Sequence, residues 1–326
     1  MSDKKRVLSG MRPTGRLHIG HYFGALKNWV EIQNDYNCFF MVADWHALTS
    51  NYADTSEIRE NCIDMVIDWL TVGIDPEKAV IFRQSEVKEH AELFLILSMV
   101  TPLGWLQRCP TYKEQLKEIQ SKDLNNYGFL GYPVLMASDI LLYKAQNVPV
   151  GEDQLAHLEF SREITRRFNN FYGDVLLEPQ ALLTKAARVP GLDKRKMSKS
   201  YDNSILIAES EENIVKKVKT MFTDPLRIKA TDEGHPEGCV VFAFHELFNK
   251  DFETRKQQCK QGCIGCVACK KELTALMCEF AKPMMQKRNE LIKDKAYVEK
   301  ILERGRERAS FEANKTMQEI RKAIKF

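Results

Sequence analysis

The sequence predicts an α/β protein built on a doubly wound parallel sheet and followed by an all-α region. Short, almost wholly apolar segments alternate with amphipathic segments of helical period through the first half of the chain. This alternation is typical of a parallel sheet that is covered by helices on both faces. From residue 209 onward the pattern is mainly helical, and we expect two domains, residues 1–205 and 206–326.

The expected strands and helices follow one another in a regular order. The strand segments are 6–10, 38–42, 79–82 and 148–150. The helical segments are 17–32, 55–72, 91–120, 134–144 and 152–168, and a Gly-, Pro- and Cys-rich stretch, 234–269, interrupts the later helices. Thr55 or Ser56 can cap the second helix, and Gly73 can end it. Asp44 and His46 directly follow the second strand, at the sheet edge where such folds bind ligands.

The composition is that of a globular protein and excludes disordered and fibrous classes. Of 326 residues, 44% are hydrophobic and 29% are charged. We expect a cytoplasmic protein with no membrane partner, since no segment has the pattern of a signal peptide or a membrane span. The net charge is +3, but residues 282–326 hold 13 Lys and Arg against 7 Asp and Glu. This basic segment favours a polyanionic partner such as a nucleic acid, with a solvated helix face as the alternative.

The first chemical motif is His18-Ile19-Gly20-His21, which opens a predicted helix directly after a strand. Free backbone N–H groups and the helix dipole favour an anion at such a place. The two imidazoles can donate hydrogen bonds to phosphate oxygens, and Gly20 lets a ligand approach the backbone. A chance match in a surface loop is the alternative.

The second motif, Lys196-Met197-Ser198-Lys199-Ser200, lies in a polar, basic loop. Two lysines on flexible stems, with hydroxyl groups between them, suit a mobile clamp on a triphosphate. A basic loop that is merely solvated is the competing interpretation.

Together and in this order, the two motifs resemble the signature pair of class I aminoacyl-tRNA synthetases, and the second matches that family's string at every position. Further strings narrow the resemblance to bacterial-type tryptophanyl-tRNA synthetases. These strings are 13–17 (PTGRL), 44–46 (DWH), 132–140 (YPVLMASDI) and 148–154 (VPVGEDQ).

The resemblance implies a reaction, partners and an architecture. The family activates L-tryptophan with ATP and Mg²⁺ to tryptophanyl-adenylate and pyrophosphate, then transfers tryptophan to tRNA(Trp). It works as a cytoplasmic homodimer. Residues 1–205 would form a Rossmann-type catalytic domain that includes a dimer-forming helical insertion and the lysine loop, and residues 206–326 a helical anticodon-binding domain. Two alternatives stay open: the tyrosyl enzyme, which shares both motifs, and a nucleotidyltransferase of the nicotinamide mononucleotide type, which shares the first.

The resemblance also implies roles for individual residues. The implied catalytic residues are His18, Gly20, His21, Lys196, Ser198 and Lys199. In the tryptophan site, Asp139 would accept the indole N–H, and the other implied contacts are Gly10, His46, Tyr132, Met136, Val148, Val150 and Gln154. The implied ATP-binding residues are Met11, Arg12, Thr14, Gly20, His21, Gly151, Asp153, Lys196, Met197, Ser198 and Lys199. Residue type alone favours a core position for Met136, Val148 and Val150, whereas a carboxylate such as Asp139 within an apolar helix needs a partner.

Three positions depart from the family pattern. Members often carry an aromatic residue where Leu8 stands and a glutamine where Arg12 stands, and some members carry a lysine where Gln115 stands. Lys113 or another cation would then contact the pyrophosphate.

Five of the nine cysteines fall between Cys239 and Cys269, and the last three are spaced C-x2-C-x2-C. This spacing favours an iron–sulfur cluster, with zinc as the alternative and free thiols as a third interpretation. A subset of tryptophanyl-tRNA synthetases resembles the segment and implies a [4Fe–4S] cluster on Cys239, Cys259, Cys266 and Cys269. Cys263 would be a spare thiol. We expect Cys38, Cys62 and Cys109 to be core residues.

Overall fold

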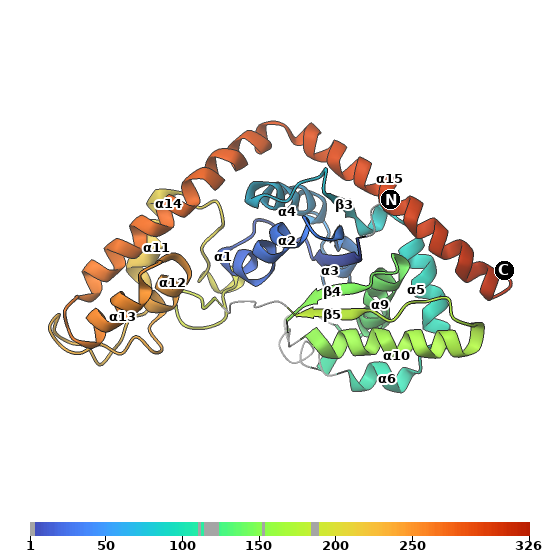
Figure 1. Cartoon of the computed structure of the whole chain (residues 1–326), viewed down its shortest axis with the longest axis horizontal. Coiled ribbons are helices and arrows are strands. Elements are labelled where there is room, and N and C mark those ends of the chain that lie inside the picture. The colour runs from blue at the N-terminus through green and yellow to red at the C-terminus, as the bar shows by residue number, and fades with distance from the viewer. Residues whose placement is uncertain (1–3, 110–111, 114–123, 152–153, 184–188) are drawn as a thin grey trace. The chain divides into compact units, whose positions relative to one another are not determined.

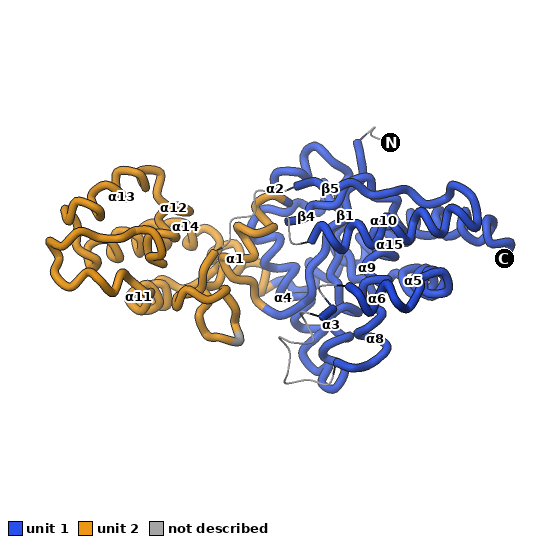
Figure 2. Tube along the Cα trace, turned by 90° about the horizontal axis from the view of Figure 1, so that it is seen from below, with its two compact units in different colours: residues 1–15, 29–185, 294–326 blue, residues 16–28, 186–293 orange. Residues whose placement is uncertain are grey.

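The computed structural model describes residues 4–109, 112–113, 124–151, 154–183 and 189–326 (Figure 1). The chain divides into two compact units (Figure 2). Unit 1 comprises residues 1–15, 29–185 and 294–326, and unit 2 comprises residues 16–28 and 186–293. These units do not coincide with the expected domains 1–205 and 206–326, because the last helix packs on the sheet of unit 1 and the second motif belongs to unit 2. In the described residues no helix is both long enough and apolar enough to cross a membrane.

The sheet of unit 1 has five parallel strands in the order β3-β2-β1-β4-β5. The strands are β1 (Arg6–Met11), β2 (Asn37–Val42), β3 (Ala79–Arg83), β4 (Asn147–Val150) and β5 (Gln180–Leu183). The strand order reverses between β1 and β4, where Val7 pairs with Cys38 on one side and with Asn147 on the other. The doubly wound parallel sheet is therefore confirmed, and its ligand-binding crevice is expected beyond the carboxyl ends of β1 and β4.

Helices cover this sheet on both faces. They are α3 (Asp44–Asn51), α4 (Ile58–Val72), α5 (Glu89–Val100), α6 (Leu103–Arg108), α8 (Tyr127–Leu130), α9 (Tyr132–Leu142), α10 (Leu155–Tyr172) and α15 (Lys295–Ala323), with a 3-10 turn η2 (Gln84–Glu86). One apolar core joins strand residues to α5, α9, α10 and α15. Trp29, Phe40 and Trp69 form a buried aromatic group, in which Trp29 stacks on Phe40 with centroids 4.4 Å apart and meets Trp69 edge-on at 5.2 Å.

Several helix boundaries differ from the sequence prediction. The helix expected over 91–120 ends at Val100, because Pro102 opens the new helix α6. The N-cap of α4 is Glu57 rather than Thr55 or Ser56, and Ser56 instead donates from its backbone N–H and hydroxyl to the carboxylate of Asp54. Gly73 ends α4 in the left-handed region, as predicted.

The C-terminal helix α15 packs against the sheet of unit 1. At its crossing with β3, a Cβ on Gly305 would lie 1.7 Å from the carbonyl oxygen of Ile81, so only glycine fits. Ion pairs hold the same helix: Arg83 with Glu299 at 2.7 Å, and Arg321 with Glu92 at 2.5 Å. Part of the basic charge of residues 282–326 is thus used within unit 1.

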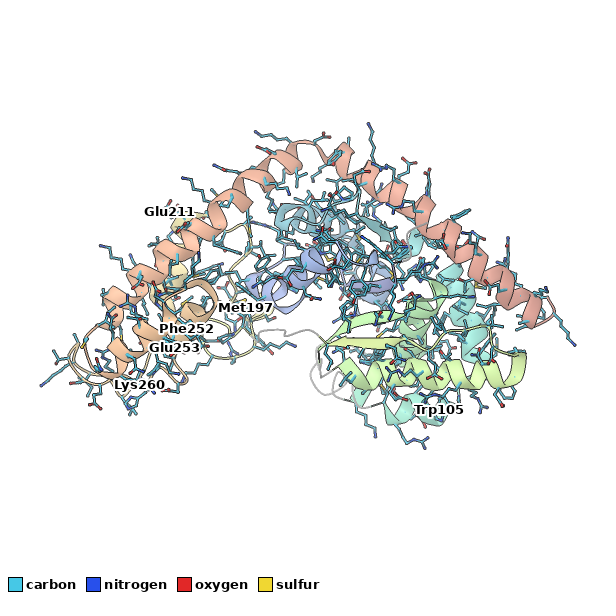
Figure 3. All side chains as sticks on the ribbon, viewed as in Figure 1. Trp105, Met197, Glu211, Phe252, Glu253 and Lys260 are labelled. Atoms are coloured by element: carbon cyan, nitrogen blue, oxygen red, sulfur yellow. The ribbon has the colours of Figure 1, made fainter. Side chains whose placement is uncertain are left out.

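Unit 2 is mainly helical. Its elements are α1 (Ile19–His21), a π-helical turn η1 (Tyr22–Leu26), a 3-10 turn η4 (Lys199–Tyr201), α11 (Glu211–Thr220), α12 (Val240–Phe248), α13 (Phe252–Lys260) and α14 (Cys266–Lys293). The helix expected over 17–32 therefore forms as α1, η1 and α2 (Lys27–Ile32). Two helices, α12 and α13, also form where the sequence suggested an irregular stretch. The side chains labelled in Figure 3 include Met197, which is buried in the core of this unit.

Candidate functional site

Asp139 on α9 is a charged group buried in unit 1, at 2% exposure. Its Oδ2 receives a hydrogen bond from His46 Nε2 at 2.8 Å. Its Oδ1 receives bonds from Gln84 Nε2 at 2.7 Å and from His90 Nδ1 at 2.6 Å. Three donors from α3, η2 and α5 therefore converge on one buried carboxylate.

The charge state of Asp139 follows from these contacts. Burial opposes the charged form, but the hydrogen bonds from His46 and His90 outweigh it, so the pKa of Asp139 is lowered. The same burial, and next the charge of Asp139, raise the pKa of Tyr143 well above its ordinary value. Asp139 is thus an anionic acceptor and Tyr143 a neutral phenol at neutral pH.

The ends of β2 and β3 position this site. The carboxylate of Asp44, at the start of α3, accepts from the backbone N–H of Ser85 at 3.0 Å and from its hydroxyl. This pair ties the segment after β2 to the turn after β3. His46 and Gln84 consequently reach Asp139 from neighbouring strand ends.

The other residues implied for tryptophan occupy varied places in unit 1. Gly10 on β1 lies against β2, where a Cβ would be 2.9 Å from the carbonyl oxygen of Met41. Val148 is in the core, and Met136 and Val150 pack against it. Tyr132 is buried, with its ring 5.9 Å from that of His157, and Gln154 is exposed at the N-cap of α10. A hydrogen bond joins two of the implied residues, His46 and Asp139.

Gln84, His90 and Tyr143 were missed by the sequence reasoning. Gln84 directly follows β3, at the same sheet edge as Asp44 and His46, and this position was a usable signal. His90 lies on α5 and Tyr143 directly follows α9, and neither gave a signal beyond the need of Asp139 for partners.

In unit 2, the segment that follows the second motif holds the first motif in place. Ile19 N–H donates to the carbonyl of Ile205 at 2.9 Å, and Ile207 N–H donates to the carbonyl of Leu17 at 3.0 Å. The backbone N–H of His18, the N-cap of α1, donates to His21 Nδ1 at 3.2 Å. The structure thus brings the two sequence motifs together within one unit.

The two imidazoles lie against each other and against Gly20. Their centroids are 3.8 Å apart. A Cβ on Gly20 would be 2.9 Å from the His18 ring, which explains the glycine between the histidines. The pKa of His18 is lowered to about 3, mainly by burial and next by the charges of His21, Lys199 and Lys196. The pKa of His21 is lowered to about 4, mainly by burial and next by the charges of the same two lysines. Both rings are therefore neutral N–H donors at neutral pH, beside two cationic side chains.

Asn203 fixes the loop that carries the second motif. Its Oδ1 accepts from the backbone N–H of Ser198 at 2.8 Å. Its Nδ2 donates to Asp193 Oδ1 at 2.8 Å and to the carbonyl of Lys196 at 3.1 Å. Met197 anchors the same loop in the core, whereas Lys196 is exposed and Lys199 half-buried. Asn203 had no distinguishing feature in the sequence.

The remaining residues implied for ATP lie at the ends of strands. Met11 closes β1, and Arg12 and Thr14 follow it as exposed side chains. Gly151 follows β4, and Asp153 lies outside the described residues, as does Gln115. Of the positions that depart from the family pattern, Leu8 is a core residue. Lys113, two residues before Gln115 in the sequence, is exposed.

The four cysteines implied for a cluster come from the beginnings or ends of three helices. Cys239 is the N-cap of α12, Cys259 is near the end of α13, and Cys266 and Cys269 lie in the first turn of α14. Burial raises the pKa of Cys269 to about 12, and Cys239, Cys259 and Cys266 add to that rise, so the four thiols share one neighbourhood. Within the described ranges, no three His, Cys, Asp or Glu side chains form a group arranged to hold a metal ion.

Cysteines outside that set behave differently. Cys263 is exposed, with its Sγ 3.8 Å from the carbonyl of Gln261. Cys38, Cys62 and Cys109 are buried, which confirms the predicted core positions.

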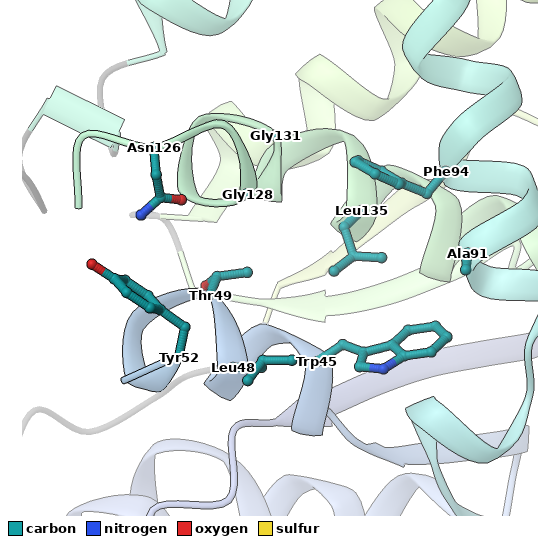
Figure 4. A pocket seen from close by; sticks show the side chains of 10 residues that line it. All are labelled: Trp45, Leu48, Thr49, Tyr52, Ala91, Phe94, Asn126, Gly128, Gly131 and Leu135. Atoms are coloured by element: carbon teal, nitrogen blue, oxygen red, sulfur yellow. The ribbon is translucent and has the colours of Figure 1, made fainter. Parts of the chain in front are cut away.

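Unit 1 also has an apolar pocket of about 520 Å³ between α3, α5, α8 and α9 (Figure 4). It is lined by Trp45, Leu48, Thr49, Tyr52, Ala91, Phe94, Asn126, Gly128, Gly131 and Leu135. None of these ten residues is among those implied for tryptophan or ATP.

Comparisons with known proteins show which family the chain resembles. Residues 2–282 match the family of class I tRNA synthetases (W and Y). A tryptophan–tRNA ligase of Thermotoga maritima is 49% identical, with 98% of each chain covered, and one of Aquifex aeolicus is 44% identical, with 98% of this chain and 99% of the relative covered. The crystal structure of a tryptophanyl-tRNA synthetase from Campylobacter jejuni, complexed with ADP and tryptophan, is 37% identical with a TM-score of 0.88, covering 98% of this chain and 100% of that one.

Proposed function

Because the chain belongs to the class I tRNA synthetases, and within them to the tryptophan–tRNA ligases, we propose that it activates L-tryptophan with ATP and Mg²⁺ and transfers it to tRNA(Trp). The observation that carries this proposal is the likeness of nearly the whole chain to tryptophan–tRNA ligases, 49% identical in one case. The buried acceptor Asp139 and the paired phosphate motifs of unit 2 support it.

Asp139 would recognise the amino acid. The indole ring offers one hydrogen-bond donor, its N–H. A buried carboxylate that expects this donor rejects phenylalanine, because the acceptor would lose its partner, by up to about 10⁴ to 10⁵ in a well-built site. His46 would lie beside the ring, since its imidazole already contacts the same carboxylate.

The motifs of unit 2 would stabilise the adenylation step. A carboxylate oxygen of tryptophan attacks the α-phosphorus of ATP, the new P–O bond forms, and the bond to pyrophosphate breaks. Neutral His18 and His21 would donate hydrogen bonds to phosphate oxygens, and Lys196 and Lys199 would neutralise the leaving pyrophosphate. Transfer to the terminal adenosine of the tRNA then needs no covalent enzyme intermediate.

Pyrophosphate exchange with the purified protein tests the proposal and its rivals. We expect exchange of label into ATP that depends on tryptophan. Exchange that depends on tyrosine would indicate the tyrosyl enzyme, and exchange without an amino acid but with nicotinamide mononucleotide would indicate the nucleotidyltransferase. Charging of tRNA(Trp) under the same conditions completes the test.

The cysteine neighbourhood would hold a [4Fe–4S] cluster through Cys239, Cys259, Cys266 and Cys269, with zinc as the alternative. The support is that Cys239 at the start of α12, Cys259 on α13 and Cys266 on α14 all raise the pKa of the Cys269 thiol. When bound, such a cluster would link these helices and stabilise their packing. Iron and sulfide analysis after anaerobic purification decides: four irons per chain are expected, whereas a colourless protein with one zinc per chain would contradict the cluster.

A second copy of the chain would cover the apolar surface of α5 and α6. Leu95, Met99 and Leu103 are 55%, 74% and 58% exposed there, next to the apolar pocket. We expect a homodimer by light scattering. A double variant, Leu95→Glu with Met99→Glu, should be monomeric, whereas Phe311→Glu, on α15, should stay dimeric. A monomeric wild type would contradict the homodimer.

Nucleic acid would bind the basic surface of α14, where Lys282, Lys287 and Lys293 are exposed. Replacing all three with alanine should weaken tRNA binding and reduce its salt dependence, because fewer phosphates are neutralised. A cytoplasmic location fits this substrate.

A further inference from the structure

A line of buried side chains extends from Asp139 away from His46. His90 Nδ1 lies 2.6 Å from Asp139 Oδ1, and His90 Nε2 lies 2.8 Å from the phenolic oxygen of Tyr143. His90 on α5 and Tyr143, which follows α9, are both at 0% exposure. None of the residues expected to bind substrate from the sequence belongs to this line beyond Asp139.

The chemistry of the three groups fixes the direction of their hydrogen bonds. Asp139 is an acceptor, so His90 Nδ1 carries a proton and donates to it. Tyr143, whose raised pKa keeps its hydroxyl protonated, then donates to His90 Nε2 as the acceptor. Tyr143 therefore selects the His90 tautomer that points its N–H at the carboxylate.

The line occupies one oxygen of Asp139 and leaves the other accessible. Oδ1 receives two donors, from His90 and Gln84, which fills its two lone-pair positions. Among the described residues Oδ2 receives one, from His46, whose side chain is 12% exposed. One lone-pair position of Oδ2 is thus left for a further N–H donor. The side-chain amide oxygen of Gln84, Oε1, is also buried without a hydrogen-bond partner in the described part of the chain.

We propose that His90, oriented by Tyr143, is a positioning residue that fixes the Asp139 carboxylate so that Oδ2 faces the indole N–H of bound tryptophan. This inference rests on the proposed function, since it assigns the specificity of the same tryptophan site. His90 does not contact substrate; it acts by locking Oδ1, which prevents the carboxylate from rotating.

The test compares tryptophan with its analogue in which sulfur replaces the indole nitrogen, which has the same shape and lacks the N–H. Their kcat/KM values in pyrophosphate exchange give a discrimination ratio. For His90→Phe we expect the KM for tryptophan to rise about tenfold to a hundredfold, as for loss of one hydrogen bond to a buried charge, and the ratio to fall by a similar factor. The KM for ATP should change less than twofold.

Matched variants separate positioning from packing. His90→Asn keeps an N–H donor near the Nδ1 position and should recover most of the discrimination ratio. Tyr143→Phe should lower the ratio about threefold to tenfold, because the tautomer is no longer selected. Phe168→Leu, in the same core and also at 0% exposure, should lower stability and leave the ratio unchanged.

The outcomes distinguish this inference from the proposed function. Equal ratios in wild type, His90→Phe and Tyr143→Phe, with only stability changed, would overturn the positioning role. A ratio that Phe168→Leu lowers as much as His90→Phe would also overturn it. If His90→Phe does not fold, Tyr143→Phe decides alone. Wild-type exchange that ignores tryptophan would instead overturn the proposed function.

Discussion

The carboxylate site of unit 1 and the phosphate motifs of unit 2 use polar groups in opposite ways. Asp139 is buried and bonded to three donors from its own chain. His18 and His21 are desolvated into neutral donors beside half-buried or exposed lysines. The first arrangement suits recognition of one fixed group, and the second suits charge that appears and departs with a triphosphate.

The difference lies in how each site is held. The Asp139 network depends on side chains that meet only when α3, η2, α5 and α9 pack together. The unit 2 motifs are held largely by backbone hydrogen bonds, from Ile19 to Ile205 and from Ile207 to Leu17. Substitutions should therefore affect folding together with function in the first site, and function alone in the second.

Replacing the carboxylate is expected to have the largest effect. Asp139→Ala leaves His46, His90 and Gln84 without their acceptor, which should lower the free energy of unfolding by about 3 to 5 kcal/mol. Tryptophan-dependent exchange should fall by more than about 10³. Urea unfolding and exchange assays measure both, and a variant as stable as wild type would contradict the network.

Removing a lysine of the second motif should slow catalysis and leave the stability of the fold unchanged. Lys199→Ala is expected to lower kcat for exchange by about 10² to 10³, as for loss of one group that stabilises transition-state charge. Its free energy of unfolding should stay within about 0.5 kcal/mol of wild type. Lys216→Ala, an exposed lysine on α11, is the matched control and should leave both quantities unchanged.

The histidines predict a pH dependence of stability. His18 has a pKa of about 3 in the folded protein and 6.5 as a free side chain. Between these values the unfolded chain binds the proton, so stability is lost as pH falls below 6.5. Relative to His18→Asn, wild type should lose roughly 2 kcal/mol between pH 7 and pH 5, from 1.5 pKa units at 1.36 kcal/mol each. A constant difference in urea unfolding would contradict the buried, neutral state.

The smallest effect is expected for Asn203, whose side chain holds the loop that carries the second motif. Asn203→Ala removes the side chain that holds Ser198, Lys196 and Asp193. The KM for ATP should rise about tenfold, as for loss of one net hydrogen bond, and the KM for tryptophan should stay within about twofold. Asn213→Ala, which loses a bond to Glu209 on a neighbouring surface, should change neither constant.

The sequence predicted much of this fold and only part of the sites. Four strands and both motifs were apparent because apolar runs and short strings are local properties. β5 was missed because Gln180–Leu183 is brief and not fully buried. The break at Pro102 was missed because the flanking residues keep an apolar pattern on both sides.

The partners of Asp139 show why the rest needed a structure. The need of a buried carboxylate for donors was clear from the sequence, but their identity was not. His90 and Asp139 are 49 positions apart and meet through the packing of α5 on α9. Asn203, five residues after Ser198, likewise matters through a loop conformation that no residue pattern signals.

The discrimination ratio between tryptophan and its sulfur analogue, measured in wild type, Asp139→Asn and Lys199→Ala, tests most directly the division of labour between the two units. The account predicts that Asp139→Asn lowers the ratio at least about tenfold, the value of one hydrogen bond to a buried charge. Lys199→Ala should slow exchange with both substrates equally and keep the ratio. An unchanged ratio in Asp139→Asn, or an equal fall in both variants, would contradict it.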